Sequence, residues 1–433
     1  TMTFGKVPLI TEVLDYNSPN IPRDEVSVIR DFIMKELTEA AAILPEKYAG
    51  GYPNEKGRIT KYACLSLKAR AALYFGDYAL AESTAKEVMD KGGFSLFKIS
   101  SLSDAQKKEA EEMSLYIDFA EKGIDKDEFV KGMFNYEALW HTENANPDNP
   151  EYIMTRQYAA SSWDYQDMTR YTSMRPNQLG GWSSVTPTQN LVDAYWGVDG
   201  HSVPQLPTPE ERAKAYNQIK ADLDAYQKPE GEAKFIAFCQ EKIKNGTLKD
   251  YKYIQEFRNR DSRMYVSILM PFKSWYESNY GDKFVYEWIK NGNNESKTGF
   301  NFRKMLSLEN DANGDGQATG DYPCIRYAEI LLIYAEAHTQ TTGYDAATEA
   351  ALNQLRDRCG MPDVPSGLSK EEGLKLIQNE RRIELAGEGF RGDDMTRYSD
   401  DYWKEHMNNV PIMTPDGDTE LTMKWSSRMR LKP

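Results

Sequence analysis

Apolar side chains recur with helical spacing in several stretches of the chain, and the clearest of these lies in residues 321–397. One helical face there, with the spacing i, i+3, i+4, i+7, is formed by Ile330, Ile333, Tyr334 and Ala337. A break at residues 341–343 follows, and a second helical pattern then runs to Gly360. Because two helices joined by so short a turn lie antiparallel, the stretch predicts a helix pair.

Earlier segments of the chain repeat this pattern. The spacing predicts an amphipathic helix from Asp24, its expected cap, to Pro45, and an antiparallel helix pair over residues 59–93. Residues 59–93 and 321–360 share a helix, a short glycine turn with tyrosine and aspartate, and an alanine-rich second helix. This internal repeat resembles the tetratricopeptide unit. Since such an array needs about three repeats for stability, we expect a further copy that has diverged or precedes the first residue.

The middle of the chain has a different pattern. Residues 103–131 are charged and helix-prone, which predicts a solvated helical excursion. Residues 135–200 are dense in Trp, Tyr, Asn, Ser, Gly and Pro, with short strand-like pieces, and predict a loop-rich region in which binding groups commonly lie. Two helices are expected at 210–226 and 234–245, and a strand at 266–270.

These patterns predict a mainly α fold, a tetratricopeptide-like superhelix of helix pairs that carries an irregular, loop-rich binding region with short strands. We expect one interleaved unit with three parts. They are an N-terminal helical-repeat part (1–100), a loop-rich aromatic ligand-binding region (101–320) and a C-terminal helical-repeat part (321–433).

Composition narrows the class of ligand. The 433 residues carry a net charge of −14, which argues against nucleic acid or an anionic membrane surface as the main partner. Aromatic residues make up 12% of the chain, with 27 Tyr and 8 Trp, and such amphipathic rings suit ligands that are polar but can be stacked upon. No run of about 18 apolar residues is present, so no membrane-spanning segment is expected.

Several motifs occur in one order along the chain. They are NPEYIM, TPTQNLVDAYWGVDG, NRDSRMY, KTGFNFRKM, RYAEILLIYAEA, ALNQLRDRCGMP and ERRIELAGEGFRGDDMTRY. Together they resemble the SusD/RagB family, surface lipoproteins that bind nutrients beside a TonB-dependent transporter. The resemblance implies an α-superhelix supporting an irregular binding region, a lipid anchor in the outer membrane with the protein exposed at the cell surface, and a SusC-like transporter as partner. The family's N-terminal lipid-bearing cysteine has no counterpart before FGKVPLI, so the anchor is expected from resemblance alone.

Glu380 and Glu384 lie one helical turn apart in the charged block. Two carboxylates at such a separation could serve as the acid and base of a glycosidase. Dense arginine around them favours paired, ionised carboxylates over a raised acid pKa. We therefore expect a structural ion-pair network, with partners drawn from Arg326, Arg381, Arg382 and Arg397.

The segment NDANGDGQATGD opens like a calcium-binding loop, with Asp311, Asn313 and Asp315 before Gly316. The twelfth position is Tyr322 rather than a bidentate glutamate. Two interpretations stay open, a structural calcium site and an Asx/Gly turn without metal.

Cysteine and histidine offer little chemistry. The four cysteines form no CxxC pair, although Cys324 and Cys359 lie at helix ends that an antiparallel pair would bring together, so a disulfide between them is one hypothesis. The histidines are far apart and show no metal spacing of the HExxH kind, and no GxSxG or phosphate-binding glycine loop is present. We expect no catalytic residue. The histidines are His141, His201, His338 and His406.

Five aromatic residues in the loop-rich region are flanked by polar residues or glycine, and we expect them to be exposed and to bind ligand: Trp163, Tyr165, Trp182, Trp275 and Trp288. An exposed ring can stack on the apolar face of a sugar while nearby polar groups bond its hydroxyls. Trp196 ends a strand-like run and is expected to be structural.

The sequence thus favours a non-enzymatic protein that binds an oligosaccharide. One alternative is a helical glycoside hydrolase that uses carboxylates of the variable region, and another is a SusD-like binder of a peptide or other nutrient. A tetratricopeptide scaffold for peptides is disfavoured by the aromatic insertion. Titration with a panel of glycans, combined with product analysis, separates binding from turnover.

Overall fold

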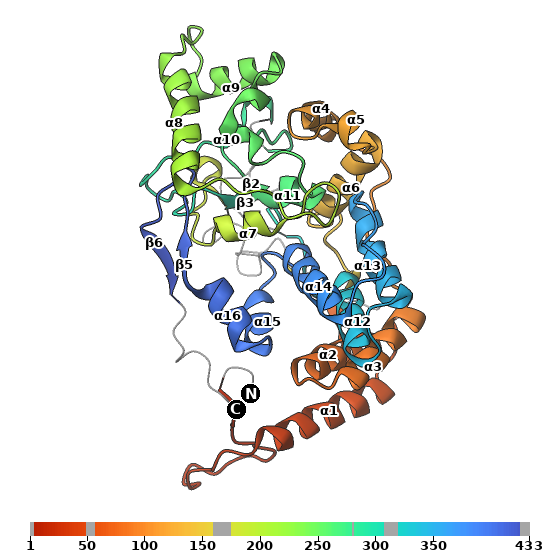
Figure 1. Ribbon diagram of the computed structural model, residues 1–433. Helices are drawn as coiled ribbons and strands as arrows, with labels where there is room; N and C mark the ends of the chain where they lie inside the picture. Colours follow the sequence, from red (N-terminus) through yellow and green to blue (C-terminus); the bar gives the residue numbers. More distant parts are fainter. Residues whose placement is uncertain (1–3, 49–56, 159–174, 279–280, 307–318, 425–433) are drawn as a thin grey trace.

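The computed structural model describes residues 4–48, 57–158, 175–278, 281–306 and 319–424, and helices dominate its regular structure (Figure 1). The longer helices are α1 (Val26–Ile43), α2 (Lys61–Tyr74), α3 (Tyr78–Lys91), α4 (Asp104–Glu112), α6 (Lys126–Ala138), α8 (Pro209–Ala225), α9 (Lys234–Lys244), α12 (Tyr327–Thr341), α13 (Ala346–Cys359), α14 (Lys370–Glu384) and α16 (Asp400–Met407). The shorter ones are α5 (Phe119–Lys122), α7 (Gln189–Ala194), α10 (Lys252–Gln255), α11 (Ser262–Ser267) and α15 (Arg391–Arg397), with 3-10 turns η2 (Met113–Leu115), η3 (Asn177–Leu179), η4 (Leu248–Asp250) and η5 (Gly281–Lys283). The strands are β1 (Tyr152–Arg156), β2 (Ile268–Leu269), β3 (Asn301–Phe302), β4 (Tyr322–Arg326), β5 (Asn408–Ile412) and β6 (Leu421–Lys424).

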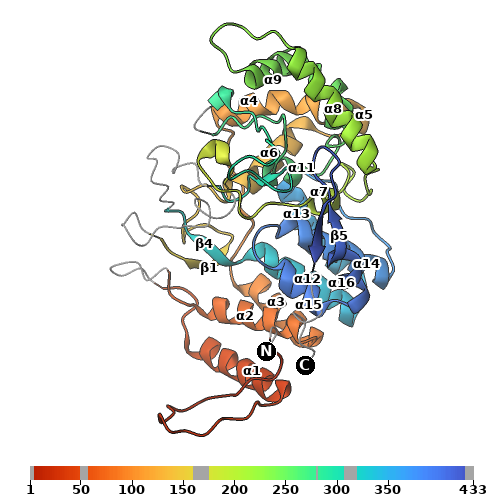
Figure 2. The ribbon, with the colours of Figure 1, turned by 90° about the vertical axis from the view of Figure 1, so that its left-hand side faces the viewer.

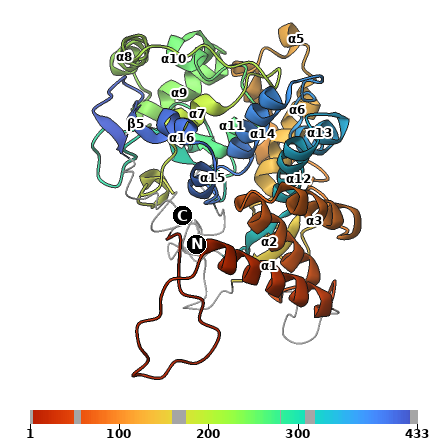
Figure 3. The ribbon, with the colours of Figure 1, turned by 60° about the horizontal axis from the view of Figure 1, so that its bottom comes forward.

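The predicted repeats stack against each other although they are far apart in the sequence. Helix α2 packs on α1 and α3, α3 packs on α12, and α12 packs on α13 and α14 (Figures 1 and 3). Ala72, Ala81 and Ala85 are fully buried, and their small side chains let the helices approach closely. The mainly α, helix-pair architecture expected from the sequence is confirmed.

Side-chain caps fix where several of these helices begin. Thr60 accepts a hydrogen bond from the Ala63 amide at the start of α2, and Asp77 accepts one from the Leu80 amide at the start of α3. The predicted cap of α1 is wrong. The Asp24 side chain accepts a hydrogen bond from the Leu9 amide instead, at 2.7 Å. Glu25 occupies the cap position, and its side chain makes no capping hydrogen bond to the amides of the first turn.

Strands join the helical array to the central region. β1 and β4 pair antiparallel, with Tyr152 opposite Arg326, and Figure 2 shows this pair beside α2. β2 pairs with β3 and β5 with β6. The strand predicted at 266–270 is observed only at Ile268–Leu269, because the residues before it belong to helix α11.

The strand-like run before Trp196 is a helix, α7, so that expectation is wrong. Gln189 donates a hydrogen bond from Nε2 to Asp193 Oδ1 at 2.6 Å, an i, i+4 contact that only a helical turn allows. Trp196 itself is partly buried and packs against the central core, as expected for a structural residue.

Two apolar clusters fill the molecule. One lies within the helical array and includes side chains of α2, α3, α12, α13 and α14. The other is built from α6, α8, α9, α11 and the segments around β2 and β3. Among the described residues, no helix is long and apolar enough to cross a bilayer.

The charged residues Asp104, Lys107, Lys108 and Glu111 of α4 are exposed, as expected for the predicted solvated excursion at 103–131, but the prediction is wrong for Glu109 and Glu112, which are buried. Arg303 donates from both Nη atoms to Glu109, at 2.6 and 2.9 Å, and from Nε and Nη2 to Glu137, at 2.5 and 2.8 Å. The Lys273 ammonium also bonds Glu109. Helix α4 therefore buries a carboxylate whose cationic partners lie more than 160 positions later in the chain.

Burial raises the pKa of the neighbouring Glu112 to about 7 from its ordinary 4.5, although a hydrogen bond from the Tyr276 hydroxyl opposes this. Between these two pKa values the native state holds a proton that the unfolded chain releases, so this group's contribution to stability falls as pH rises through the window. We expect Glu112→Gln, which cannot ionise, to match the wild type near pH 4 and to melt at a higher temperature at pH 8. Thermal unfolding at both pH values tests this.

Glu111→Gln serves as the matched control, because Glu111 is the exposed neighbour on the same helix. A Glu112→Gln variant that melts no higher than the wild type at pH 8 contradicts the prediction.

Candidate ligand-binding site

Of the three predicted binding aromatics that the structure describes, Trp182 is the exposed one, with 48% of its surface accessible. It follows η3 on a turn closed by two backbone hydrogen bonds, from the Gly181 amide to the Pro176 carbonyl and from the Ser183 amide to the Arg175 carbonyl, both 3.0 Å. A side chain at Gly181 would lie 2.1 Å from the Arg175 carbonyl oxygen, so this tight turn requires glycine.

The Trp182 turn is anchored on the segment that follows η5. Gln178 Nε2 donates to the Val285 carbonyl at 3.2 Å, and Gln178 Oε1 accepts from the Glu287 amide at 2.9 Å. Because the Gln178 side chain makes both bonds, it fixes the Trp182 turn to the backbone at Val285 and Glu287. An exposed ring on so well fixed a turn is suited to stacking on a ligand.

Trp275 and Trp288 are buried, with exposed fractions of 1% and 5%, so their predicted exposure is wrong. The Arg303 guanidinium lies over the Trp275 ring at 5.2 Å, and the Trp288 indole donates to the Ser296 carbonyl at 2.9 Å. The polar neighbours that suggested exposure of Trp275, Lys273 and Ser274, are themselves buried. Both rings belong to the central core.

Other predicted site residues lie outside the described part of the chain. These are Trp163, Tyr165 and the candidate calcium ligands Asp311, Asn313 and Asp315. All four cysteines are free, which contradicts the hypothesis of a Cys324–Cys359 disulfide. The Cys359 sulfur instead accepts a hydrogen bond from Arg358 Nε at 3.3 Å.

A pocket of about 970 Å³ with both polar and apolar lining opens between α8, α10 and the loops before them. Helices α8 and α10 lie in the part of the molecule opposite α1 (Figure 1). Its lining includes amide, ammonium and carboxylate groups around one aromatic ring: Glu211, Lys214, Gln218, Tyr251 and Gln255. Tyr251 is oriented by a hydrogen bond from its hydroxyl to Asp222 Oδ2 at 2.9 Å.

A buried ion pair contributes to the wall of this pocket. Arg212 Nε donates to Glu256 Oε2 at 2.9 Å, and Gln189 Nε2 donates to Glu256 Oε1 at 3.0 Å. Burial raises the pKa of Glu256, while the Arg212 charge opposes the rise. The predicted helix at 210–226, observed as α8, forms one side of this pocket, whereas α10 on the other side was not predicted. Tyr251 between Asp250 and Lys252 was the local signal that could have marked it.

The Glu380 and Glu384 carboxylates are fully buried and bonded to arginines, which confirms the predicted ion-pair network. Glu384 accepts from Arg326 Nη1 at 2.8 Å and from Arg263 Nη1 at 3.0 Å, and it also pairs with Arg358. The Arg358 and Arg326 charges hold the pKa of Glu384 well below its ordinary value despite its burial.

The partners of this network differ from those predicted, except for Arg326. Glu380 pairs with Arg356 at 2.6 Å and with Arg263 at 2.6 Å. The arginines adjacent to it in sequence face elsewhere, because consecutive helical residues point in different directions. Arg381 pairs with Asp394, Arg382 bonds Asn190, and Arg397 pairs with Glu336.

Comparison with known proteins gives a consistent result. The model of the SusD family matches residues 150–430. A curated relative, a SusD-like protein P2 of Formosa agariphila, is 33% identical over 92 residues, which are 20% of this chain and 18% of that protein.

Solved structures share the fold over nearly the whole chain. A SusD-like protein from Bacteroides fragilis superposes with a TM-score of 0.67 at 25% identity, covering 100% of this chain and 73% of that one. A SusD-like carbohydrate binding protein from the same species has a TM-score of 0.63 at 21% identity, covering 92% of this chain and 63% of that one. The chain thus spans less than two thirds of that second structure and a small part of the curated relative.

Proposed function

Because the chain belongs to the SusD family, we propose that it is a non-catalytic binding protein that captures an oligosaccharide at the cell surface and passes it to a partner TonB-dependent, SusC-like transporter. In this proposal the protein is lipid-anchored in the outer membrane. The ligand class follows the Bacteroides fragilis relative described as carbohydrate binding.

The exposed Trp182 ring carries the proposal within this chain. A planar ring on a fixed turn can stack on the apolar face of a sugar, and the pocket around Tyr251 offers polar groups as well as apolar surface to such a ligand. The Glu380 and Glu384 pair supports a non-catalytic role, because a glycosidase acid needs a raised pKa and the arginines lower that of Glu384.

We expect Trp182→Ala to weaken glycan binding about tenfold or more, the loss of roughly 1.4 kcal/mol of stacking and burial. Isothermal titration of the full chain against a glycan panel measures the affinity, and chromatography of the mixtures shows whether any glycan is cleaved. Tyr16→Ala is the control, since that ring is 99% exposed and lies in the N-terminal segment.

Three outcomes separate the possibilities. Loss of binding in Trp182→Ala without product formation supports the proposal. If glycan binding is lost in Tyr251→Ala but kept in Trp182→Ala, the ligand binds in the pocket beside α8 and not on the Trp182 turn. Cleavage of a glycan by the wild type, or binding of peptides but no glycan, would overturn the proposed function.

A further inference from the structure

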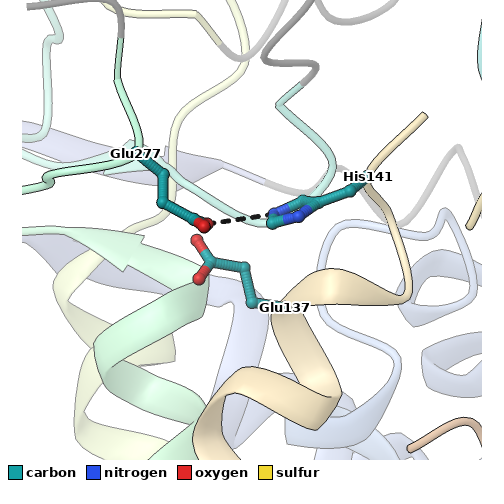
Figure 4. A group of neighbouring side chains, drawn as sticks. All are labelled: Glu137, His141 and Glu277. Carbon is teal, nitrogen blue, oxygen red and sulfur yellow. Dashed lines mark ion pairs between the residues drawn. The ribbon is translucent and has the colours of Figure 1, made fainter. Parts of the chain in front are cut away.

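A group of polar side chains at the end of α6 contains ligand atoms that lack hydrogen-bond partners. Glu137 belongs to the last turn of α6, His141 follows four residues later, and Glu277 comes from the segment between β2 and β3 (Figure 4). One ligand atom from each residue lies within 4.8 Å of the other two. His141 Nε2 and Glu277 Oε2 are buried and lie 3.7 Å apart, and neither makes a hydrogen bond to any other described residue.

We propose that Glu137, His141 and Glu277 bind a first-row divalent transition-metal ion such as Zn²⁺, with water as a fourth ligand. Three protein ligands plus water is a common tetrahedral arrangement for Zn²⁺. Bonds of about 2.0–2.2 Å place neighbouring ligand atoms roughly 3.3–3.5 Å apart, so the 3.7 Å between His141 and Glu277 is already close to the required spacing.

Outer groups hold the three ligands in this orientation. Ser103 Oγ donates to Glu277 Oε1 at 2.7 Å, which leaves Oε2 turned toward the imidazole. Glu143 Oε1 lies 3.6 Å from His141 Nδ1, the ring nitrogen other than the one that faces Glu277, and is near enough to accept a hydrogen bond after a small rotation. A carboxylate behind a ligating histidine is the usual support of a metal-bound imidazole.

Glu137 can ligate without losing its partner. Its two oxygens accept hydrogen bonds from Arg303, and each carboxylate oxygen has a further lone pair. His141 lies on the turn that follows α6, where its amide donates to the Ala138 carbonyl at 3.2 Å, and this turn keeps it beside the last turn of the helix. Spacing among the four histidines alone does not indicate this site, because only one of its ligands is a histidine.

The donor set and the charges select the class of ion. Ca²⁺ takes six to eight oxygen ligands, whereas one imidazole and two carboxylates suit Zn²⁺ and its neighbours. Glu109, Glu137 and Glu277 are opposed by two cations, Arg303 and Lys273. With a neutral imidazole the cluster keeps one negative charge, which a bound cation offsets.

Protonation of His141 would be the metal-free way to offset the same charge, and binding experiments separate the two. The full-length chain, stripped with a chelator, is titrated with Zn²⁺ in competition with a chromogenic chelator, and thermal unfolding is followed in parallel. We expect one Zn²⁺ per chain and a melting temperature that rises with Zn²⁺ concentration.

Glu277→Gln is the decisive variant. It keeps the shape of the side chain and removes a carboxylate close to Glu137, so the metal-free variant should fold as well as the wild type. Its Zn²⁺ affinity should fall about tenfold or more, and the melting temperature should no longer respond to Zn²⁺. His141→Gln should behave alike, whereas His201→Gln, whose side chain is 56% exposed beside Asp199, should keep wild-type binding.

Some results would overturn the site. These are no Zn²⁺ binding by the wild type, equal binding by wild type and Glu277→Gln, or loss of binding in His201→Gln. Binding of Ca²⁺ but not Zn²⁺ would overturn the class of metal. Because glycan binding is measured separately, failure here leaves the proposed function untouched.

Discussion

Glu384→Gln should lower the free energy of unfolding by about 3–5 kcal/mol, the cost of breaking a buried charge network by removing one partner. The substitution leaves Arg326, Arg358 and Arg263 facing one another around a neutral amide. All four side chains are fully buried, so water cannot solvate the positive charge that loses its Glu384 partner. Each arginine keeps another carboxylate, which leaves one charge of the network uncompensated and not three. An amide also replaces one acceptor oxygen by a donor, which clashes with a ring of donors.

Chemical denaturation followed by circular dichroism measures this effect as a shift of the unfolding midpoint. Glu371→Gln is the matched control, because Glu371 is on the same helix, is 80% exposed and pairs only with Lys375 at the surface. That variant should keep the wild-type midpoint. If Glu384→Gln also kept it while abolishing a measured glycan hydrolysis, the acid–base interpretation would replace the structural one.

The network explains why the charged block at the end of α14 matters for a protein whose ligand is expected elsewhere. Arg326 leaves β4 beside the helical array, Arg263 belongs to α11 in the central cluster, and Glu384 bonds both. Arg326 also bonds Glu151 and Glu388. The block thus ties the helical array to the region that carries the Trp182 turn.

Local pattern was sufficient for the helices that bury one face. Helices α1, α2, α3, α12 and α13 begin and end within a few residues of the predicted positions. Strong periodicity and glycine turns fix these elements without reference to the rest of the chain. Their stacking also followed, because the repeat between 59–93 and 321–360 indicated two similar pairs.

The errors have a common physical cause, which is partners distant in sequence. Glu109 seemed solvated because its neighbours are charged, yet its partner Arg303 is 194 positions away. The Glu384 partner Arg263 is 121 positions away. The flanks of Trp275 suggested exposure, and only the fold shows that Lys273 is buried by pairing with Glu109.

Only the part of the candidate site that depends on local sequence, the exposure of Trp182, could be predicted. Trp182 stands next to two glycines, and a glycine-rich turn often holds a ring at the surface. The pocket beside Tyr251 and the cluster of Glu137, His141 and Glu277 depend on how separate segments meet, which local pattern does not contain.

Gly132 lies where α6 crosses the end of α13, and the two backbones touch there. A methyl group at Gly132 would be 2.1 Å from the carbonyl carbon of Cys359 and 2.2 Å from the Gly360 amide nitrogen. These atoms cannot move aside easily, because Asn135 Nδ2 donates to the Arg358 carbonyl at 3.0 Å and Ser262 Oγ donates to the Cys359 carbonyl at 2.6 Å.

We therefore expect Gly132→Ala to destabilise the protein by about 3 kcal/mol, the upper range for overpacking, even though alanine is the better helix former by about 1 kcal/mol. The control is Gly392→Ala in α15, where, apart from its chain neighbours and the backbone of its own helix, no described atom lies within 4 Å of the added methyl group. This variant should be neutral or slightly stabilising. Unfolding midpoints of both variants against the wild type give the comparison. An unchanged midpoint for Gly132→Ala would mean that α6 and α13 can move apart at no cost in stability. The helical array and the central region would then not pack as closely at this crossing as the structure shows.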